Sequence, residues 1–452
     1  MSALQHHPDH IFTVAGIRET INEQRAIELV KPLQDAIDSK QHDRYTKLVL
    51  TNKSFTIEAA HIFSNIIQQL HGITHCDYSD IIAGQSTDNA VEVLNILTRC
   101  LDKHKLIEFN ISDNALGQKG IIAIGTALSH HDTLQHVYFN NNGLQGDAVN
   151  EIAVLLVGHK HNVADNQLHN LHTFEIFNNL LTDTGGIALS TVLHAATQLR
   201  HIKIQTNRIS EAGGTAIMTA LKHHKHLHTL ILSDNSFGGM AGQIALNLVV
   251  TNPNLHVLNI SDIGFEKTHI LGIIKQLANP KVTPKLCELH LSHSELTQHN
   301  VTLLIQALHS KQHIHTLVLE GNELHSKGCI ELLNALQTHP HIKHINLNEN
   351  QISQPAVDSI ISFIKSNKTI QLLSLKNNLF NDESVELIQS AVEHAHNQNI
   401  LIELDDQEAD DEDIDDDSDN DEIAEPDSSD IDLDKEEHEI DELAHKIDAT
   451  KI

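Results

Sequence analysis

Three consecutive asparagines stand out among the residues of this chain that could do chemistry. Asn140, Asn141 and Asn142 fall in the stretch LQHVYFNNNGL, residues 134–144. A carboxamide offers a hydrogen-bond donor and an acceptor without charge, so it can orient another polar group but is a poor base. The stretch therefore predicts positioning or binding rather than acid–base catalysis.

The same stretch is one copy of a repeat, L-x-x-L-x-L-x-x-N-x-L, that recurs through most of the chain. We call its asparagine the marker position. It falls at Asn114, Asn142, Asn179, Asn207, Asn235, Asn322, Asn350 and Asn378, mostly 28 residues apart. Degenerate copies place Lys53, Ile81, Ile263 and Ser294 there, which brings the count to about twelve repeats. The longer step from Asn142 to Asn179 predicts an insertion near residues 158–166.

Each repeat pairs a strand pattern with a helix pattern. Leu230 belongs to the first, and within residues 117–131 the side chains of Ile121, Ile124 and Leu128 share one helical face. Neither half can bury its apolar face alone, so the repeats must stack. The pattern predicts an α/β fold, a leucine-rich repeat horseshoe solenoid with a parallel concave sheet and outer α-helices.

Three regions follow from the composition. We expect an N-terminal cap at residues 1–44, the repeat domain with a closing strand at 45–404, and an acidic tail at 405–452. Residues 403–452 hold 25 Asp and Glu but 3 Lys, which is −22 of the net charge of −31. Such a tail should be mostly disordered, with a short helix at 433–447. It either steers a basic partner or only solubilises the protein, and the charge disfavours nucleic acid.

Enzyme and metal chemistry find little support in the sequence. The 37 histidines mostly recur in one phase of the repeat, and the four cysteines have no CxxC spacing, so we expect no metal site. A nucleophile elbow, a Walker A loop, an HExxH motif and a Rossmann fingerprint are all missing from the sequence. Apolar runs of about 18 residues are also missing, so we expect no membrane insertion and a cytoplasmic location.

What remains is a binding surface. The position before the marker should form a row along one rim of the stacked repeats, and it holds Asp80, Asp113, Asn141, Asn178 and Asp234. Polar residues also flank the buried strand position, in the pairs Glu108/Asn110, His136/Tyr138, Thr173/Glu175 and His201/Lys203. They are either a protein-binding face or a solvated sheet.

Consecutive repeats carry a more specific signature. YSDIIAG (78–84), ISDNALG (111–117) and VYFNNNGL (137–144) resemble successive repeats of the Ran GTPase-activating proteins, a leucine-rich repeat family of the ribonuclease-inhibitor type. The resemblance implies an activator that acts in trans on a Ran-type small GTPase in its GTP form, in support of nucleocytoplasmic transport. It also implies that Asn141 positions the catalytic glutamine of the GTPase, so GTP and Mg belong to the partner and the protein itself needs no cofactor.

Further expectations follow from the same resemblance. A Ran-binding protein is a second implied partner, the nuclear envelope is a second implied location, and we expect a monomer. The residues expected to contact the GTPase are Asp80, Gln85, Asp113, Asn140, Asn178 and Asp234.

The chain departs from the family at basic positions. Gln85, Thr87 and Leu180 stand where the family has basic residues. These replacements leave a second interpretation open, in which the same fold is a non-catalytic protein-binding scaffold or inhibitor.

Overall fold

The computed structural model describes residues 8–14, 16–129, 132–158, 168–393, 395 and 400–407. The acidic tail from residue 408, with its expected helix, and most of the expected insertion lie outside them. The chain forms two compact units. Unit 1 holds the described residues up to Leu227 together with Asp234–Phe237, and unit 2 holds His228–Ser233 and the described residues from Gly238 onward.

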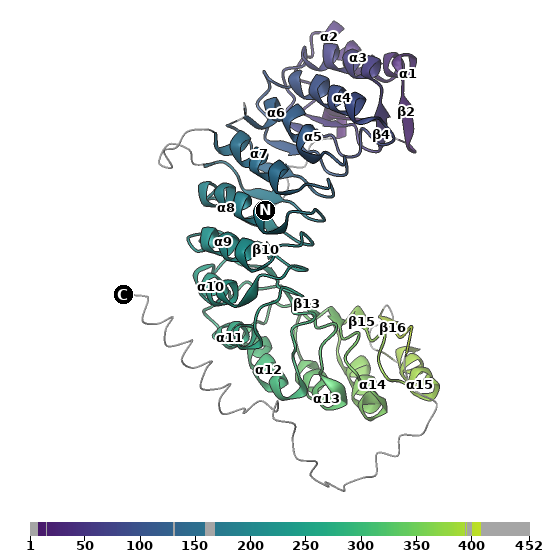
Figure 1. Cartoon of the computed structure of the whole chain (residues 1–452). Coiled ribbons are helices and arrows are strands. Elements are labelled where there is room, and N and C mark those ends of the chain that lie inside the picture. The colour runs from purple at the N-terminus through teal and green to yellow at the C-terminus, as the bar shows by residue number, and fades with distance from the viewer. Residues whose placement is uncertain are drawn as a thin grey trace. The chain divides into compact units, whose positions relative to one another are not determined.

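Unit 1 alternates short strands with helices (Figure 1). Its strands are β1 (Ile11–Thr13), β2 (Glu19–Ile21), β3 (Lys47–Val49), β4 (Lys53–Phe55), β5 (His75–Asp77), β6 (Glu108–Asn110), β7 (His136–Tyr138), β8 (Thr173–Glu175) and β9 (His201–Lys203). Its helices are η1 (Pro8–His10), α1 (Glu23–Leu29), α2 (Lys31–Asp38), α3 (Ile57–Ile67), α4 (Thr87–Arg99), α5 (Gly117–Ala123), α6 (Gly125–Ser129), α7 (Gly146–Val157), α8 (Thr182–Ala195) and α9 (Glu211–Leu221).

Unit 2 continues the same alternation. Its strands are β10 (Thr229–Ile231), β11 (Val257–Asn259), β12 (Glu288–His290), β13 (Thr316–Val318), β14 (His344–Asn346), β15 (Leu372–Ser374) and β16 (Leu401–Glu403). Its helices are α10 (Gly238–Thr251), α11 (Lys267–Leu277), η3 (Gln298–Asn300), α12 (Val301–Ser310), α13 (His325–Leu336), η4 (Gln354–Ala356), α14 (Val357–Ser366) and α15 (Asp382–Glu393). The last helix and strand of the described residues are α15 and β16.

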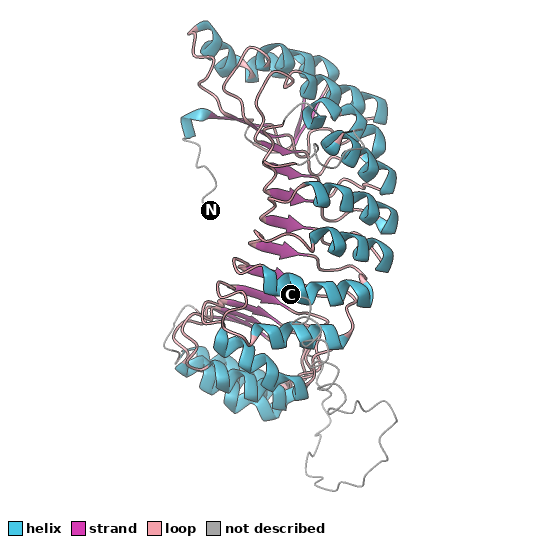
Figure 2. Cartoon of the chain, turned by 90° about the vertical axis from the view of Figure 1, so that its left-hand side faces the viewer, coloured by secondary structure: helices cyan, strands magenta, loops and turns pink. Residues whose placement is uncertain are grey.

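Parallel strands stack in sequence order within each unit. In unit 1 the order is β1, β3, β5, β6, β7, β8 and β9, while β2 pairs with β4 separately. Phe109 lies beside Val137, and Val137 lies beside Phe174. Each of these central residues is buried against the helices, which cover one face of the sheet (Figure 2). The structure confirms the leucine-rich repeat solenoid that the period predicts.

The marker asparagines join one repeat to the next. Asn142 is fully buried; its Oδ1 accepts the backbone N–H of Asn114 at 2.8 Å, and its Nδ2 donates to Ile111 O at 3.1 Å. The backbone N–H of Asn142 in turn donates to Asn179 Oδ1 at 2.9 Å. A three-residue strand leaves backbone groups unpaired where it turns away, and the marker side chain pairs them. Asn142 therefore has a structural role.

The helix expected over residues 117–131 is interrupted. Gly117–Ala123 and Gly125–Ser129 form separate helices, α5 and α6. The break falls at Ile124, whose φ of −89° and ψ of 5° leave the α-helical region before Gly125. Ile121, Ile124 and Leu128 are all buried, so the expected apolar face is confirmed although the helix is not continuous.

None of the helices within the described residues is long and apolar enough to cross a membrane.

Buried histidines occupy turns that follow helices in unit 1. His104 Nε2 lies 2.6 Å from Leu70 O, and His224 Nε2 lies 3.1 Å from Ala196 O. Burial is the largest influence on both imidazoles and lowers the pKa of each below the ordinary 6.5. At a pH between 6.5 and the lowered pKa, these imidazoles are protonated in the unfolded chain but neutral in the folded protein. Protonation therefore favours the unfolded chain, and the free energy of unfolding decreases as the pH falls through this range.

We expect the free energy of unfolding to decrease as pH is lowered from about 7.5 to about 5.5, and to decrease less in His224→Asn. An amide can fill such a turn, because Asn367 donates to Leu336 O at 3.0 Å in unit 2. Urea unfolding across this pH range measures the effect. His223→Asn, at the exposed neighbouring histidine, should follow the wild type, and an identical pH slope in His224→Asn would contradict the assignment.

Candidate functional site

The position before the marker has a left-handed backbone in unit 1. We call five of the residues there the rim row: φ is 53° at Asp80, 63° at Asp113, 52° at Asn141, 55° at Asn178 and 57° at Asp234. Asn and Asp tolerate this conformation better than other side chains, because their short polar groups bond locally. Backbone geometry therefore accounts for part of the Asn and Asp pattern that the sequence shows.

Three members of the rim row are joined through their side chains. Asn141 Nδ2 donates to Asp113 Oδ1 at 2.8 Å, and Asn178 Nδ2 donates to Asn141 Oδ1 at 2.8 Å. All three residues are exposed. We call Asp113, Asn141 and Asn178 the amide ladder. Stacking thus brings together three predicted site residues that lie 28 and 37 positions apart in sequence.

The Asn141 carboxamide keeps binding capacity beyond the ladder. A primary amide carries two N–H donors and an oxygen with two lone pairs. The ladder uses one N–H and one lone pair of Asn141, and the other of each remains on an exposed side chain. The remaining N–H donor and oxygen lone pair of Asn141 together match the acceptor and donor of a primary amide on another molecule.

Asn140 has a different environment, although it directly precedes Asn141. It is buried; its Nδ2 donates to Glu175 Oε2 at 3.1 Å, and its Oδ1 accepts the backbone N–H of Phe177 at 3.2 Å. These bonds link β7 to the end of β8. The structure therefore places this predicted contact residue inside the repeat stack, where it supports the rim row.

Glu175 is the centre of a charged cluster beside the rim row. Its Oε1 lies 2.8 Å from His201 Nε2, and Lys203 Nζ lies 3.8 Å from the centre of the Phe177 ring. Burial raises the pKa of Glu175, but the bonds from His201 and Asn140 and the charge of Lys203 outweigh it, so the pKa is lowered. Glu175 is accordingly an anion that two neighbouring repeats hold in place.

Asp80 is held by a residue that sequence analysis missed. Its carboxylate forms an ion pair with Arg18 from the N-terminal segment. Next to Arg18, the carbonyls of Gly16 and Ile17 accept hydrogen bonds from Lys53 Nζ, whose side chain is fully buried at a degenerate marker position. Nothing in the sequence signals the ion pair, because Arg18 lies 62 residues before Asp80.

Two other predicted residues, Gln85 and Asp234, stand apart from the amide ladder. Gln85 lies just before α4, and its Nε2 donates to Phe55 O. Asp234 is exposed in the rim row, in the same left-handed conformation as Asn141. Sequence analysis also missed Arg208, which follows the marker Asn207 and is exposed with a φ of 55°. Arg208 is an exposed basic side chain in the repeat that stacks next to the repeat of Asn178, where the Asn178 N–H donates to Gln205 O at 3.0 Å.

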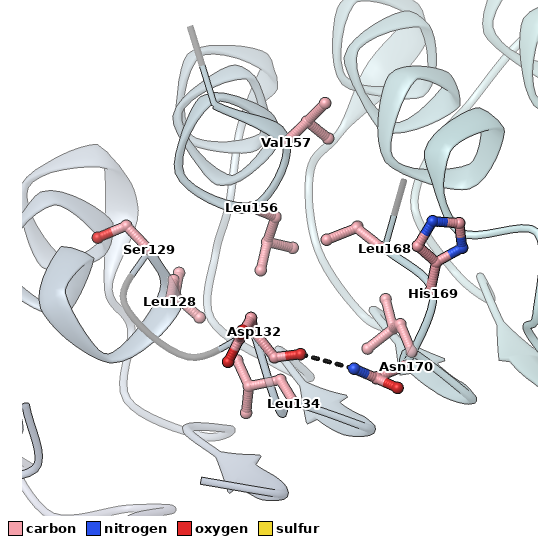
Figure 3. Close-up of a pocket in the computed structure, with 10 residues that line it drawn as sticks. Leu128, Ser129, Asp132, Leu134, Leu156, Val157, Leu168, His169 and Asn170 are labelled. Carbon is pink, nitrogen blue, oxygen red and sulfur yellow. Dashed lines mark hydrogen bonds between the residues drawn. The ribbon is translucent and has the colours of Figure 1, made fainter. Parts of the chain in front are cut away.

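A cavity of about 350 Å³ lies elsewhere in unit 1 (Figure 3). Leu134, Leu156 and Leu171 line its apolar part, and Asn170 Nδ2 donates to Asp132 O at 2.9 Å. Asp132 and Asn170 precede β7 and β8, whereas the rim row follows the strands, so the two features lie at opposite edges of the sheet. Over the part of the chain that the structure describes, no group of three or more His, Cys, Asp or Glu could hold a metal ion.

Comparison with known proteins agrees with this architecture. A family model described as "Leucine Rich repeat" matches residues 102–125. RAN GTPase-activating protein 1 of Arabidopsis thaliana is 36% identical over 132 residues, which are 29% of this chain and 24% of that protein. RAN GTPase-activating protein 2 of the same plant is 36% identical over 124 residues, 27% of this chain and 22% of that protein. The chain thus spans about a quarter of the length of these relatives.

A solved structure shares the fold alone. The crystal structure of the Rad7 and Elc1 complex in yeast has a chain that matches with a TM-score of 0.50 and 14% identity, covering 85% of this chain and 84% of that one. The sequence matches are the more specific finding, and they confirm the resemblance that the repeat signature indicates. The chain thus has the leucine-rich repeat fold, and part of its sequence is similar to the Ran GTPase-activating proteins.

Proposed function

We propose that this protein binds a Ran-type small GTPase in its GTP form and accelerates GTP hydrolysis. The observation that carries the proposal is the exposed Asn141 carboxamide, held between Asp113 and Asn178 on the rim. The names of the two relatives support the choice of partner. Asn141 would contact the GTPase directly, and the rest of the rim row would frame the contact.

The mechanism that we infer is positioning. A GTPase of this class uses a glutamine to orient the attacking water. The unused N–H and lone pair of Asn141 would bind the carboxamide of that glutamine and hold it in the productive geometry. The acceleration of hydrolysis then comes from ordering the glutamine that the GTPase already has. A glutamine held in position loses less entropy when the transition state is reached.

An arginine finger is the alternative source of acceleration. Arg18 is paired with Asp80, whereas Arg208 is an exposed arginine in the repeat that follows Asn178. Under the positioning mechanism Arg208 contributes to binding, so its loss raises the concentration needed for half-maximal rate. A collapse of the maximal rate in Arg208→Ala would instead favour the arginine finger.

Charge supports a partner with a basic surface. Glu175 is anionic beside the ladder, Asp113 and Asp234 are exposed on the rim, and the whole chain carries −31. The partner would bring GTP and Mg, and this protein would act in trans without a cofactor of its own. Activity in the cytoplasm or at the nuclear envelope, with a Ran-binding protein as second partner, completes the proposal.

Single-turnover hydrolysis with a panel of GTP-loaded small GTPases tests it. We expect the full-length protein to accelerate hydrolysis by Ran about 10³-fold or more, and other GTPases far less. Binding to Ran without acceleration would support the scaffold or inhibitor interpretation instead. Neither binding to nor acceleration of any GTPase in the panel would overturn the proposal.

A further inference from the structure

We propose that Asp113 and Asn178 are positioning residues that hold the Asn141 carboxamide in one of its two orientations. The Nδ2 group points toward Asp113 and the Oδ1 atom toward Asn178. The inference rests on the proposed function for its catalytic consequence. It concerns the residues that act through Asn141 rather than Asn141 itself.

The hydrogen-bonding groups of the amide ladder favour one orientation of the Asn141 carboxamide. An amide side chain can rotate by half a turn and exchange its oxygen for its nitrogen with almost no change in shape. The Asp113 carboxylate only accepts hydrogen bonds, so it favours the orientation in which Asn141 Nδ2 faces it at 2.8 Å. The opposite orientation would place Asn141 Oδ1 against a negative oxygen. Asn178 strengthens the same choice, because its Nδ2 donates to Asn141 Oδ1.

The backbone beneath the ladder is already ordered. The N–H groups of Asp113, Asn141 and Asn178 donate to the carbonyls of Asn140, Phe177 and Gln205 at 2.9, 2.8 and 3.0 Å. With the loops held in this way, the main freedom left to Asn141 is rotation of its side chain. The ladder removes that rotation before a partner binds, so the ordering cost does not fall on the complex.

A single orientation matters for recognition of another amide. The remaining N–H and lone pair of Asn141 lie at defined places, so a partner amide can pair with them in one sense only. If the Asn141 carboxamide could rotate freely, one of its two orientations would place its N–H group against the N–H group of the partner amide, and no hydrogen bond would form. Asp113 and Asn178 would therefore raise the fraction of complexes in the productive geometry.

Unit 2 offers a matched control. Asn377 also precedes a marker, has a φ of 52°, and donates through Nδ2 to Glu349 Oε1 at 3.2 Å. This pair is an amide and a carboxylate at the same position of the repeat, in the other compact unit. Glu349→Gln removes the carboxylate of this control pair.

The decisive variant exchanges the two outer side chains. In the double variant Asp113→Asn, Asn178→Asp, the carboxylate moves to the other end of the ladder, so the Asn141 amide is favoured in the reversed orientation. Net charge is unchanged, and both positions keep residue types that accept a left-handed backbone. We expect its maximal single-turnover rate with GTP-loaded Ran to fall about tenfold, with the half-saturating concentration changing far less.

Two further measurements complete the test. Glu349→Gln should keep the wild-type rate. In full-length protein labelled with 15N-asparagine, the side-chain signal of Asn141, assigned by its loss in Asn141→Gly, should shift in Asp113→Asn and Asn178→Asp but not in Glu349→Gln. A double variant with the wild-type maximal rate, or an Asn141 signal unmoved by either single change, would overturn the inference.

The inference and the proposed function fail separately. If the wild type accelerates hydrolysis and the double variant does so equally, the inferred positioning is wrong while the function stands. If the wild type accelerates no GTPase, the function is wrong, and the Asn141 signal still decides whether Asp113 and Asn178 orient the amide.

Discussion

Replacing Asn141 with glycine is expected to lower the maximal single-turnover rate of Ran GTP hydrolysis about 10²–10³-fold, the usual cost of losing one positioned hydrogen-bonding group in an active site. Glycine is the informative replacement, because φ at Asn141 is 52°. Alanine there would add strain of about 1–2 kcal/mol to the loss of the amide. Glycine already occupies the corresponding position of unit 2 at Gly321, where φ is 66°.

Asn377→Gly is the control for this experiment, because it makes the same change at the same repeat position in unit 2. It should leave the rate with Ran unchanged. The measurement separates the maximal rate from the concentration that gives half of it. A loss confined to the half-saturating concentration would mean that Asn141 only binds the partner, and the positioning mechanism would then be wrong.

Replacing the next asparagine, Asn142, with alanine is expected to destabilise the fold instead, by about 3 kcal/mol in the free energy of unfolding. The change removes the acceptor of the buried Asn114 N–H and one of two donors to Ile111 O, which still accepts from Asn114 Nδ2 at 3.0 Å. A buried donor left without a partner costs about 1–3 kcal/mol, and the lost bond to Ile111 O adds about 1 kcal/mol. Urea unfolding followed by circular dichroism measures the difference from the wild type.

Asn141→Gly is the control for stability. Its side chain is exposed and its backbone conformation suits glycine, so the free energy of unfolding should change by less than about 1 kcal/mol. Two adjacent asparagines would then show opposite behaviour, one in rate and the other in stability. Equal stability of Asn142→Ala and Asn141→Gly would contradict the structural role of the marker.

The sequence by itself determined the repeat, its strand and helix halves, and the separate place of the rim. Burial in such a fold follows a local period, so the strand position of Val137 and the marker position of Asn142 are recognisable from their own repeat, and the structure buries both residues. The position of Asn141 before the marker also follows from the period. The functional roles of Asn141 and the residues around it stay predictions for the experiments above.

Only the tertiary structure decided what each rim side chain contacts. Asn140 is a predicted contact residue that directly precedes Asn141, yet it is buried against Glu175 from a repeat 35 residues later. Asp80 is paired with Arg18, and Asp113 and Asn178 bond to Asn141 from two other repeats. These contacts depend on which repeats stack side by side and on a left-handed backbone that directs each side chain outward. A repeat pattern specifies where a residue sits along the rim, whereas the neighbouring repeats determine the direction in which its hydrogen-bonding groups point.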